Sequence, residues 1–490
     1  MPARTTHLLG LAVALGCGGE PATSLGPDAG LTDDAAFGDA TPDAAASPPP
    51  EGYGLALALA RATDTNRDPR VVEVTLEARL AEMEFLSGKR TAVWTYGGTV
   101  PGPLILANVG DRLVLHLRNG LPEETILHSH GVRLPNAMDG SEHTQAPIAP
   151  GETFTYDYVL QDAGLFWYHP HFHSAAQLGR GLYGPLLVRD PGDPVAGDEA
   201  VLVLDDMLIY EDGTLAPPDE GGHLGDIFGR EGNVLLVNGR RHPVVPVRRG
   251  RPLRWRILNA GNARYFRLGL GGQRAWLVGT DGGLLERPVP VEEVLIEPAS
   301  RVDLVLVPTA APGTVVELPW LPFDRGFLTG RREPEDLLAL RILDEPAETH
   351  PPPPEALRVI EPFDAAGAAA ERTLVFGERP VGGRVLFTFN DVPYPPGLDL
   401  EAAVNTSEVW TLQNETDAGH PFHLHGFFFQ VLDVDGAPPP FRSWRDTVHV
   451  GPKSTMRIGI PFDGRAGHWM FHCHILDHAE IGMMGTLRLR

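Results

Sequence analysis

One cysteine of this 490-residue chain lies between two histidines, in the segment His472-Cys473-His474. Successive side chains of a β-strand point to opposite faces. On a strand, the Cys473 thiolate would therefore face one metal centre while the two imidazoles face another. Only a few covalent bonds would separate the two centres. The segment thus predicts a bridge across which electrons pass between metal ions.

Histidines also recur in pairs spaced two residues apart. The chain has 19 histidines, and chance would give roughly one such pair. Four separate pairs occur, at His128/His130, His169/His171, His423/His425 and His472/His474, and His173 lies two residues beyond His171 without a role that we can assign. The spacing places both imidazoles of a pair on the same strand face. Together the pairs offer enough imidazoles for about three metal ions with two or three nitrogens each.

A second set of ligands is expected on the other side of Cys473. His420 lies an odd number of residues before His423, so on a regular strand it faces away from His423. His478 and Met483 follow Cys473 closely. Two histidines, one thiolate and a long, weak axial thioether form the ligand set of a blue copper site. His420, Cys473, His478 and Met483 are therefore predicted to bind one copper ion.

These segments resemble the four copper signatures of the multicopper oxidases, a family that includes laccases, bacterial cuprous oxidases and bilirubin oxidases. The matching text is HSHG at 128–131, GLFWYHPHFH at 164–173, HPFHLHG at 420–426 and HCHILDHAEIGMM at 472–484. Further family-like text occurs at 97–121, and the likeness covers most of residues 55–490. The competing interpretation is a scatter of core and surface histidines, which would not produce four ordered motifs.

The resemblance implies four copper ions per chain and a role for each ligand. The type 1 copper takes His420, Cys473, His478 and Met483; the type 2 copper takes His128 and His423; the type 3 pair takes His130, His169, His171, His425, His472 and His474. The first and last domains each supply four ligands to this trinuclear cluster. The cluster is therefore expected to lie between those two domains.

The implied reaction is one-electron oxidation of a reducing substrate at the type 1 copper. Four electrons pass through Cys473 and its flanking histidines, and dioxygen is reduced to two waters at the cluster. Water formation needs protons, and Asp139 matches the acidic residue that the family has near the cluster. We expect Asp139 to act as a proton donor or relay. The alternative is a turn residue, because Asp-Gly is a common turn signal.

A second proton path is less well supported by the residues. Bacterial relatives often have a carboxylate immediately after the type 1 histidine, where this chain has Ala479. Asp477 and Glu480 flank that position, and either is a candidate substitute.

The substrate is only partly constrained. The chain has 8 methionines and no methionine-rich cluster of the kind that cuprous oxidases often carry. Because soft thioethers suit Cu(I), laccase-like oxidation of phenols or aromatic amines is favoured over cuprous or other metal-ion oxidation in copper tolerance. Asp417, close before His420, is either a substrate contact or a solvated loop acid. An alternative of a different class, a non-catalytic copper-binding or scaffold protein, is disfavoured because no ligand is missing.

Length and charge set the remaining limits. A chain of 490 residues predicts about three domains. The formal net charge of −24 argues against nucleic acid or an anionic membrane surface as a partner. We expect a monomer whose partners are dioxygen and a small reducing substrate.

The chain is predicted to be all-β. Segments such as VVEVTLEARL and DRLVLHLRN alternate in polarity at strand length and end at Gly, Pro, Asn or Asp. No long segment repeats at the helical period. The family resemblance implies three cupredoxin-like Greek-key β-sandwich domains. We place them at 52–190, with trinuclear ligands, at 191–345, and at 370–490, with type 1 and trinuclear ligands; a Pro/Ala-rich connector spans 346–369.

The first residues resemble an export signal. Residues 1–17 contain the apolar run HLLGLAVALGC, which is too short to span a bilayer as a helix. Its ALGC ending resembles a lipoprotein cleavage box with Cys17 as the lipidated residue; a plain secretory leader is the alternative. Residues 18–51 are predicted to form a disordered acidic and Pro-rich tether. We expect a periplasmic or cell-envelope lipoprotein, alternatively a secreted protein, whose membrane contact is limited to the lipid.

Overall fold

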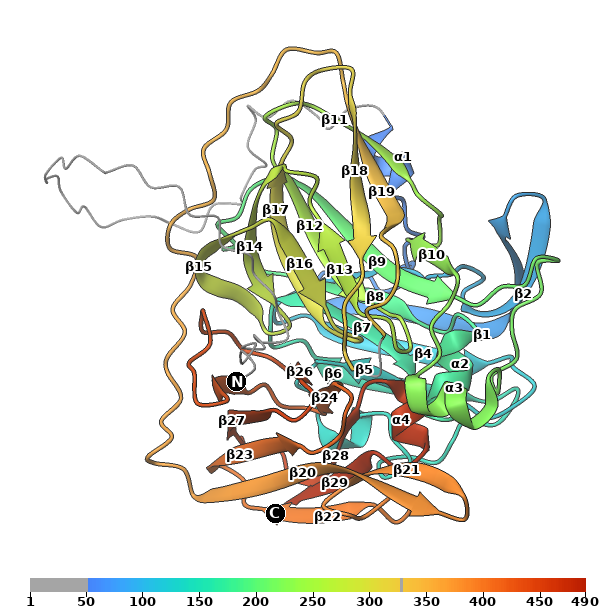
Figure 1. The fold of residues 1–490 in the computed structure, drawn as a ribbon, viewed down its shortest axis with the longest axis vertical. Coiled ribbons are helices and arrows are strands. Elements are labelled where there is room, and N and C mark those ends of the chain that lie inside the picture. The colour runs from blue at the N-terminus through green and yellow to red at the C-terminus, as the bar shows by residue number, and fades with distance from the viewer. Residues whose placement is uncertain (1–51, 327–328) are drawn as a thin grey trace, which may run out of the picture.

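The computed structural model describes residues 52–326 and 329–490. Six sheets occur in this part of the chain, and they pack in pairs as three β-sandwiches (Figure 1). In Figure 1 the second sandwich lies at the top, the third at the bottom and the first between them. The predicted all-β class is confirmed. The predicted signal segment 1–17, Cys17 and the tether 18–51 lie outside the described residues.

The first sandwich contributes two histidine pairs, both from one of its two sheets. One sheet has the order β2 (Lys89–Tyr96), β1 (Val71–Leu86), β4 (Arg112–Asn119), β6 (Thr153–Val159), and the other has the order β3 (Ile105–Asn108), β8 (Gly184–Arg189), β7 (Gly164–Pro170), β5 (Leu127–His130). Side chains of β4 alternate between buried and more exposed positions, as expected for a strand with one face on the core. By contrast, β5 and β7 are buried at every residue, so their histidines lie in the interior.

The second sandwich carries no histidine pair. One sheet has the order β10 (Val234–Val237), β9 (Asp198–Met207), β12 (Leu253–Asn259), β17 (Arg301–Val307), β14 (Arg274–Thr280), β15 (Gly283–Val291), and the other has the order β11 (Val244–Val247), β19 (Glu335–Ile342), β18 (Val315–Leu321), β13 (Phe266–Gly269), β16 (Glu293–Ile296). Arg301, the first residue of β17, reaches toward the histidines of the other two sandwiches.

The third sandwich contributes the remaining two pairs and the cysteine. One sheet has the order β21 (Arg384–Phe389), β20 (Ala370–Val381), β23 (Ser407–Asn414), β27 (Thr455–Pro461), β25 (Gln430–Val434), and the other has the order β22 (Leu398–Ala402), β29 (Met484–Leu489), β28 (Gly467–Cys473), β24 (His420–Leu424), β26 (Thr447–Val450). In this second sheet β24 pairs with β28 so that His423 lies opposite His472.

Helices are few and short. They are α1 (Tyr53–Ala56), η1 (Asn136–Met138), α2 (Ser174–Gly179), α3 (Gly222–Phe228) and α4 (Leu476–Glu480). Figure 1 shows α3 of the second sandwich beside α4, which follows Cys473. None of these helices, within the ranges given above, is both long and apolar enough to cross a bilayer.

One hydrophobic core extends through the first and third sandwiches. Its members include Leu115 and Tyr156 of the first sandwich and Trp410, Phe422 and Cys473 of the third. Burial of apolar surface is worth roughly 25 cal/mol per Å², so this shared core holds the two histidine-bearing sheets together. The second sandwich has a core of its own.

Candidate metal centre

Eight buried histidines meet between the first and third sandwiches. They are His128 and His130 of β5, His169 and His171 of β7 and its end, His423 and His425 of β24 and its end, and His472 and His474 of β28 and its end. Strand pairing sets His128 opposite His169 and His423 opposite His472. Across the interface, the rings of His130 and His423 stack with centroids 3.8 Å apart, and those of His128 and His425 at 3.9 Å. The structure thus brings together all eight residues predicted for the trinuclear cluster.

Acceptors on the far side of these rings fix which nitrogen carries the proton. His128 Nδ1 donates to the Asp139 carbonyl at 2.6 Å, and His423 Nδ1 donates to the Asp446 carbonyl at 2.9 Å. His169 Nδ1 donates to the Pro170 carbonyl at 3.0 Å. Because a carbonyl only accepts, each of these Nδ1 atoms is protonated and each Nε2 has a free lone pair.

The opposite nitrogens face one another without protein partners. Buried ring nitrogens without a hydrogen-bond partner are Nε2 of His128, His169 and His423, Nδ1 of His130, and both nitrogens of His474. His425 Nε2 and His472 Nε2 lie 3.2 Å apart. Buried polar atoms rarely remain unpaired in proteins, and lone pairs that converge in this way suit metal ions. These residues therefore fit copper, which imidazole ligands favour.

Burial keeps the imidazoles in their neutral, metal-binding form. Desolvation lowers the pKa of His128 to about 3 and that of His472 to about 4. The other six cluster histidines have pKa values well below the ordinary range for the same reason, and neighbouring imidazoles add to this effect. At neutral pH the cluster therefore offers lone pairs and carries no charge of its own.

A second, smaller group of donors surrounds Cys473. Its Sγ lies 3.6 Å from His420 Nδ1 and 3.7 Å from His478 Nδ1, and the two Nδ1 atoms lie 3.1 Å apart. The outer nitrogens are held by protein: His420 Nε2 bonds Thr416 Oγ1 at 2.8 Å, and His478 Nε2 donates to the Ile227 carbonyl at 2.9 Å. Burial raises the pKa of the Cys473 thiol, so a bound metal would have to displace its proton.

Met483 lies beside this group. Its side chain is fully buried in the same hydrophobic core as Cys473. Its backbone bonds to Cys473 and to His478, at 3.1 and 3.0 Å. The His420–Cys473–His478 group and the eight-histidine cluster are joined through one segment, because His472 Nδ1 donates to the Cys473 carbonyl at 2.9 Å. This hydrogen bond gives a short path between the two groups.

Asp139 lies against the histidine cluster. Its Oδ2 accepts a hydrogen bond from His425 Nδ1 at 2.9 Å, and its Oδ1 is buried without a partner. Burial raises the pKa of Asp139 to about 6, although nearby His128 and Arg465 oppose the rise. The carboxyl therefore gains and loses a proton near neutral pH.

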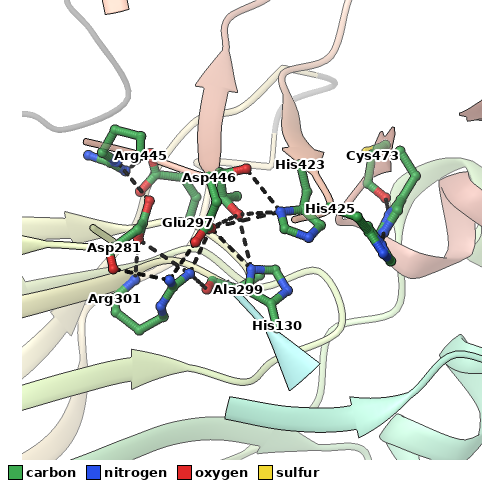
Figure 2. Close-up of polar contacts among 12 residues, drawn as sticks. His130, Asp281, Glu297, Ala299, Arg301, His423, His425, Arg445, Asp446 and Cys473 are labelled. Carbon is green, nitrogen blue, oxygen red and sulfur yellow. Dashed lines mark hydrogen bonds and ion pairs between the residues drawn. The ribbon is translucent and has the colours of Figure 1, made fainter. Parts of the chain in front are cut away.

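Sequence analysis missed a second acid at the cluster, Asp446, which directly precedes β26 (Figure 2). Its Oδ1 accepts a hydrogen bond from His130 Nε2 at 3.2 Å, and its carbonyl accepts the one from His423. Arg301 binds both carboxylate oxygens, at 2.8 and 2.5 Å. Burial disfavours the charge on Arg301, yet Asp446 and Asp281 keep its pKa above the usual value. No spacing in the sequence links Asp446 to His130, 316 residues earlier.

The Arg301–Asp446 pair continues into a chain of buried charges between the second and third sandwiches. Figure 2 shows Asp281 between Arg301 and Arg445. Arg445 Nε donates to Asp281 Oδ2 at 2.8 Å, and its Nη2 lies 3.4 Å from Glu297 Oε1. Gly131 accommodates this arrangement after the first histidine pair: its φ is +82°, and a Cβ there would lie 2.6 Å from Asp446 Oδ2. The network therefore ties all three sandwiches to the histidine cluster.

The remaining predicted site residues lie elsewhere. The Asp417 side chain is 72% exposed and forms an ion pair with Lys453 at 3.1 Å, which fits the solvated loop acid better than a substrate contact. Asp477 is buried and bonds the Arg230 backbone and guanidinium. Glu480 accepts a hydrogen bond from the Ala175 backbone at 2.8 Å. Among the described residues, no hydrogen bond or ion pair joins either acid to the histidine cluster.

Comparison with known proteins agrees with this arrangement. Three family models described as multicopper oxidase match residues 77–193, 198–314 and 366–490. Multicopper oxidase MmcO of Mycobacterium tuberculosis is 33% identical over 463 residues, covering 85% of this chain and 87% of that protein. A laccase of Bacillus subtilis is 27% identical, covering 80% and 89%. The solved structure of a Campylobacter jejuni multicopper oxidase, described as a metallo-oxidase, superposes with a TM-score of 0.79 at 30% identity, covering 88% and 94%.

The chain therefore belongs to the multicopper oxidase family. It is a copper-dependent oxidoreductase that oxidises a reducing substrate with dioxygen as acceptor. The predicted family, enzyme class and three-sandwich cupredoxin-like fold are confirmed.

Proposed function

We propose that this enzyme is laccase-like and oxidises phenols or aromatic amines one electron at a time. The proposed type 1 ligands are His420, Cys473, His478 and Met483; the proposed type 2 ligands are His128 and His423; the proposed type 3 ligands are His130, His169, His171, His425, His472 and His474. The observation that carries the proposal is the set of buried, unpartnered nitrogens that converge between two sandwiches, one segment away from Cys473.

Copper at these ligands would supply one-electron transfer at the first site and reduction of dioxygen to two waters at the second. The chain itself supplies orientation and protons. Backbone carbonyls hold the rings of His128, His169 and His423 so that their free nitrogens point inward. The Cys473 carbonyl and His472 Nδ1 connect the two sites. The Asp139 carboxyl lies within one hydrogen bond of His425, and we assign it the role of proton donor or relay.

The composition of the segment that covers the proposed type 1 site supports an organic substrate. α3 covers the His478 edge through Ile227. Neither α3 nor its flanks at 210–232 contain methionine, the soft ligand that Cu(I) favours. The second candidate is a metal-ion oxidase. Acids on the same segment, Asp219, Glu220 and Asp226, suit a hard cation such as Fe(II) better than Cu(I).

One set of assays tests the function and its substrate class. Copper-loaded protein is assayed for oxygen uptake with a phenolic dye precursor, a phenol, Cu(I) and Fe(II) in parallel. We expect the phenolic compounds to be oxidised with the highest kcat/KM. A markedly higher value for either metal ion would overturn the laccase-like assignment and favour the second candidate.

A second experiment tests the ligands. Elemental analysis should give about four copper ions per chain, the complement that a blue site and a trinuclear cluster require. Cys473→Ser should abolish both the intense blue absorption and oxidation of every substrate. Retained catalysis in this variant would overturn the ligand assignment.

We also propose the organisation of the whole chain. Its domains are 52–190, 191–345 and 370–490, joined by the connector 346–369, after a signal segment at 1–17 and a tether at 18–51. We assign it to the periplasm or cell envelope as a monomer with a lipid on Cys17. Mass spectrometry of the mature amino terminus tests the lipid, since an unmodified terminus at another residue would support a secretory leader instead.

A further inference from the structure

A buried arginine outside every copper motif lies beside the proposed type 1 ligands. Arg325 belongs to the segment between β18 and β19 and is only 2% exposed. Its carbonyl accepts a hydrogen bond from the Gly419 backbone at 2.5 Å, and Gly326 bridges to Ala418. These contacts fix Arg325 against the residues that lead directly into His420.

The guanidinium of Arg325 points toward the covering segment of the other type 1 histidine. Its Nη2 donates to the Phe228 carbonyl, next to the Ile227 carbonyl that accepts from His478. A Cβ built at Gly229 would lie 3.6 Å from this Nη2 and 2.7 Å from Ile475 Cγ2. Ile475 follows Cys473 by two residues. The guanidinium therefore lies close to the residues that position His420, Cys473 and His478.

The positive charge of Arg325 is incompletely neutralised. Its Nε and Nη1 are buried and have no hydrogen-bond partner among the described residues. Its one carboxylate partner within the described part of the chain is Glu231, at 3.4 Å. That carboxylate also pairs with Arg264 at 3.6 Å and with Arg332 at 3.0 Å. A single acid thus faces three guanidinium groups, one of which, Arg264, has Asp206 as a further partner.

We propose that Arg325 tunes the type 1 site by raising the reduction potential of copper held by His420, Cys473 and His478. Reduction removes one positive charge from the site, so a nearby cation stabilises the reduced form. Because Arg325 is buried, salt screens its charge only weakly. A higher potential widens the range of substrates that the enzyme can oxidise, which makes Arg325 a specificity-determining residue. This inference rests on the proposed type 1 ligand set.

Four variants of the copper-loaded full chain test the role of charge. Arg325→Met removes the cation with little change in side-chain length, and Arg325→Lys keeps the cation. Glu231→Gln removes the opposing negative charge. Arg332→Met is the matched control, because Arg332 pairs with the same Glu231 but is 41% exposed. The type 1 midpoint is measured by titration against a redox dye, followed through the blue absorption.

We expect Arg325→Met to shift the redox equilibrium about tenfold toward the oxidised form, the scale of a unit charge acting through an effective dielectric of about 20. For one electron this corresponds to about 59 mV. Arg325→Lys should shift it by less than about threefold, because the charge remains. Glu231→Gln should shift the equilibrium in the opposite direction. Arg332→Met should have little effect, because solvent screens its charge.

The outcomes separate this inference from the ligand assignment. An Arg325→Met protein with normal blue absorption and an unchanged midpoint would overturn the inference, as would an equal shift in Arg325→Lys. If Arg325→Met does not fold, Glu231→Gln decides: a raised midpoint supports the inference and an unchanged midpoint overturns it. A wild-type protein without blue absorption would overturn the type 1 assignment itself, and the role of Arg325 with it.

Discussion

Residues that contact the far side of each imidazole control which nitrogen faces the metal. Four of the cluster histidines use backbone carbonyls for this purpose, but His130 uses the Asp446 carboxylate and His425 uses the Asp139 carboxylate. A side-chain acceptor can be removed by mutation, whereas a carbonyl cannot. Asp446 and Asp139 are therefore the positions where orientation of the cluster is open to experiment.

Asp446→Asn should destabilise the protein and weaken copper binding. Arg301 would lose the carboxylate that binds it through both oxygens while remaining buried, and breaking a buried ion pair typically costs about 3–5 kcal/mol. The amide is a weaker acceptor for His130 than the carboxylate, and mutation of such a partner behind a metal ligand lowers metal affinity about 10- to 100-fold. Urea unfolding and copper content measure the two effects.

The control for Asp446 is Asp433→Asn. Asp433 pairs with Arg457 at 3.2 Å in a partly exposed setting, where an ion pair contributes about 0–1 kcal/mol. Equal destabilisation in both variants would contradict a special role for the buried pair.

Asp139→Asn tests the proposed proton donor. The amide keeps the shape of the side chain and a hydrogen-bond acceptor for His425, but it cannot release a proton. We expect reoxidation of the fully reduced enzyme by dioxygen to slow by about 10²-fold or more, while substrate still reduces the type 1 site at the normal rate. Stopped-flow absorption separates these two steps. Unchanged dioxygen turnover would show that Asp139 has no part in proton delivery.

The sequence predicted the histidines of the cluster well and their neighbours poorly. Spacing on a strand is local, so the opposite orientations of Cys473 and His472 followed from parity alone. Asp446, Arg301 and Arg325 reach the site through contacts between segments far apart in the chain. No periodicity carries that information. Asp417 was a weak candidate because its proximity in sequence to His420 does not determine where its side chain points.

At the scale of elements, three of the four histidine pairs have one member within a strand and the other just beyond its end. β7 ends at Pro170, β24 at Leu424 and β28 at Cys473. His171, His425 and His474 therefore lie one residue beyond their strands. Beyond β7 the second imidazole turns away from the first: the ring of His171 is 4.9 Å from His425 but 6.4 Å from His169. Sequence parity placed both imidazoles of a pair on one face and did not foresee this divergence.

β24 depends on the aromatic side chain between its ligands. Phe422 is fully buried and lies among the rings of Phe376, Phe389, Trp410 and Phe471. Phe422→Ala should reduce the free energy of unfolding by about 3–5 kcal/mol, because it removes a large buried side chain and leaves a cavity. Denaturant unfolding of the copper-free protein measures this without any contribution from metal.

Val359→Ala is the control for Phe422. Val359 is 81% exposed, and such substitutions usually change stability by less than about 0.5 kcal/mol. A loss below about 1 kcal/mol in Phe422→Ala would mean that neighbouring rings collapse into the space.

At the scale of the whole molecule, the histidine cluster lies at the meeting point of all three sandwiches. The first and third sandwiches supply the eight imidazoles, and the second supplies Arg301 and Asp281 behind Asp446. Ile227 of the same second sandwich accepts a hydrogen bond from the His478 ring. The second sandwich carries no histidine pair, yet its contacts place it behind both proposed metal sites.

Copper removal should therefore weaken the whole assembly and not one sheet alone. Ions bound only by the folded protein stabilise it by about 2.7 kcal/mol each when free copper is 100 times Kd. We expect thermal unfolding of chelated protein to begin at a lower temperature and to regain its midpoint when copper is restored.

His171→Ala should reduce this copper-dependent gain in stability, because His171 lies at the junction of the first and third sandwiches. His468→Ala is the control, since that ring lies outside the cluster beside His143. Equal midpoints with and without copper in the wild type would show that the eight histidines do not link the sandwiches through metal.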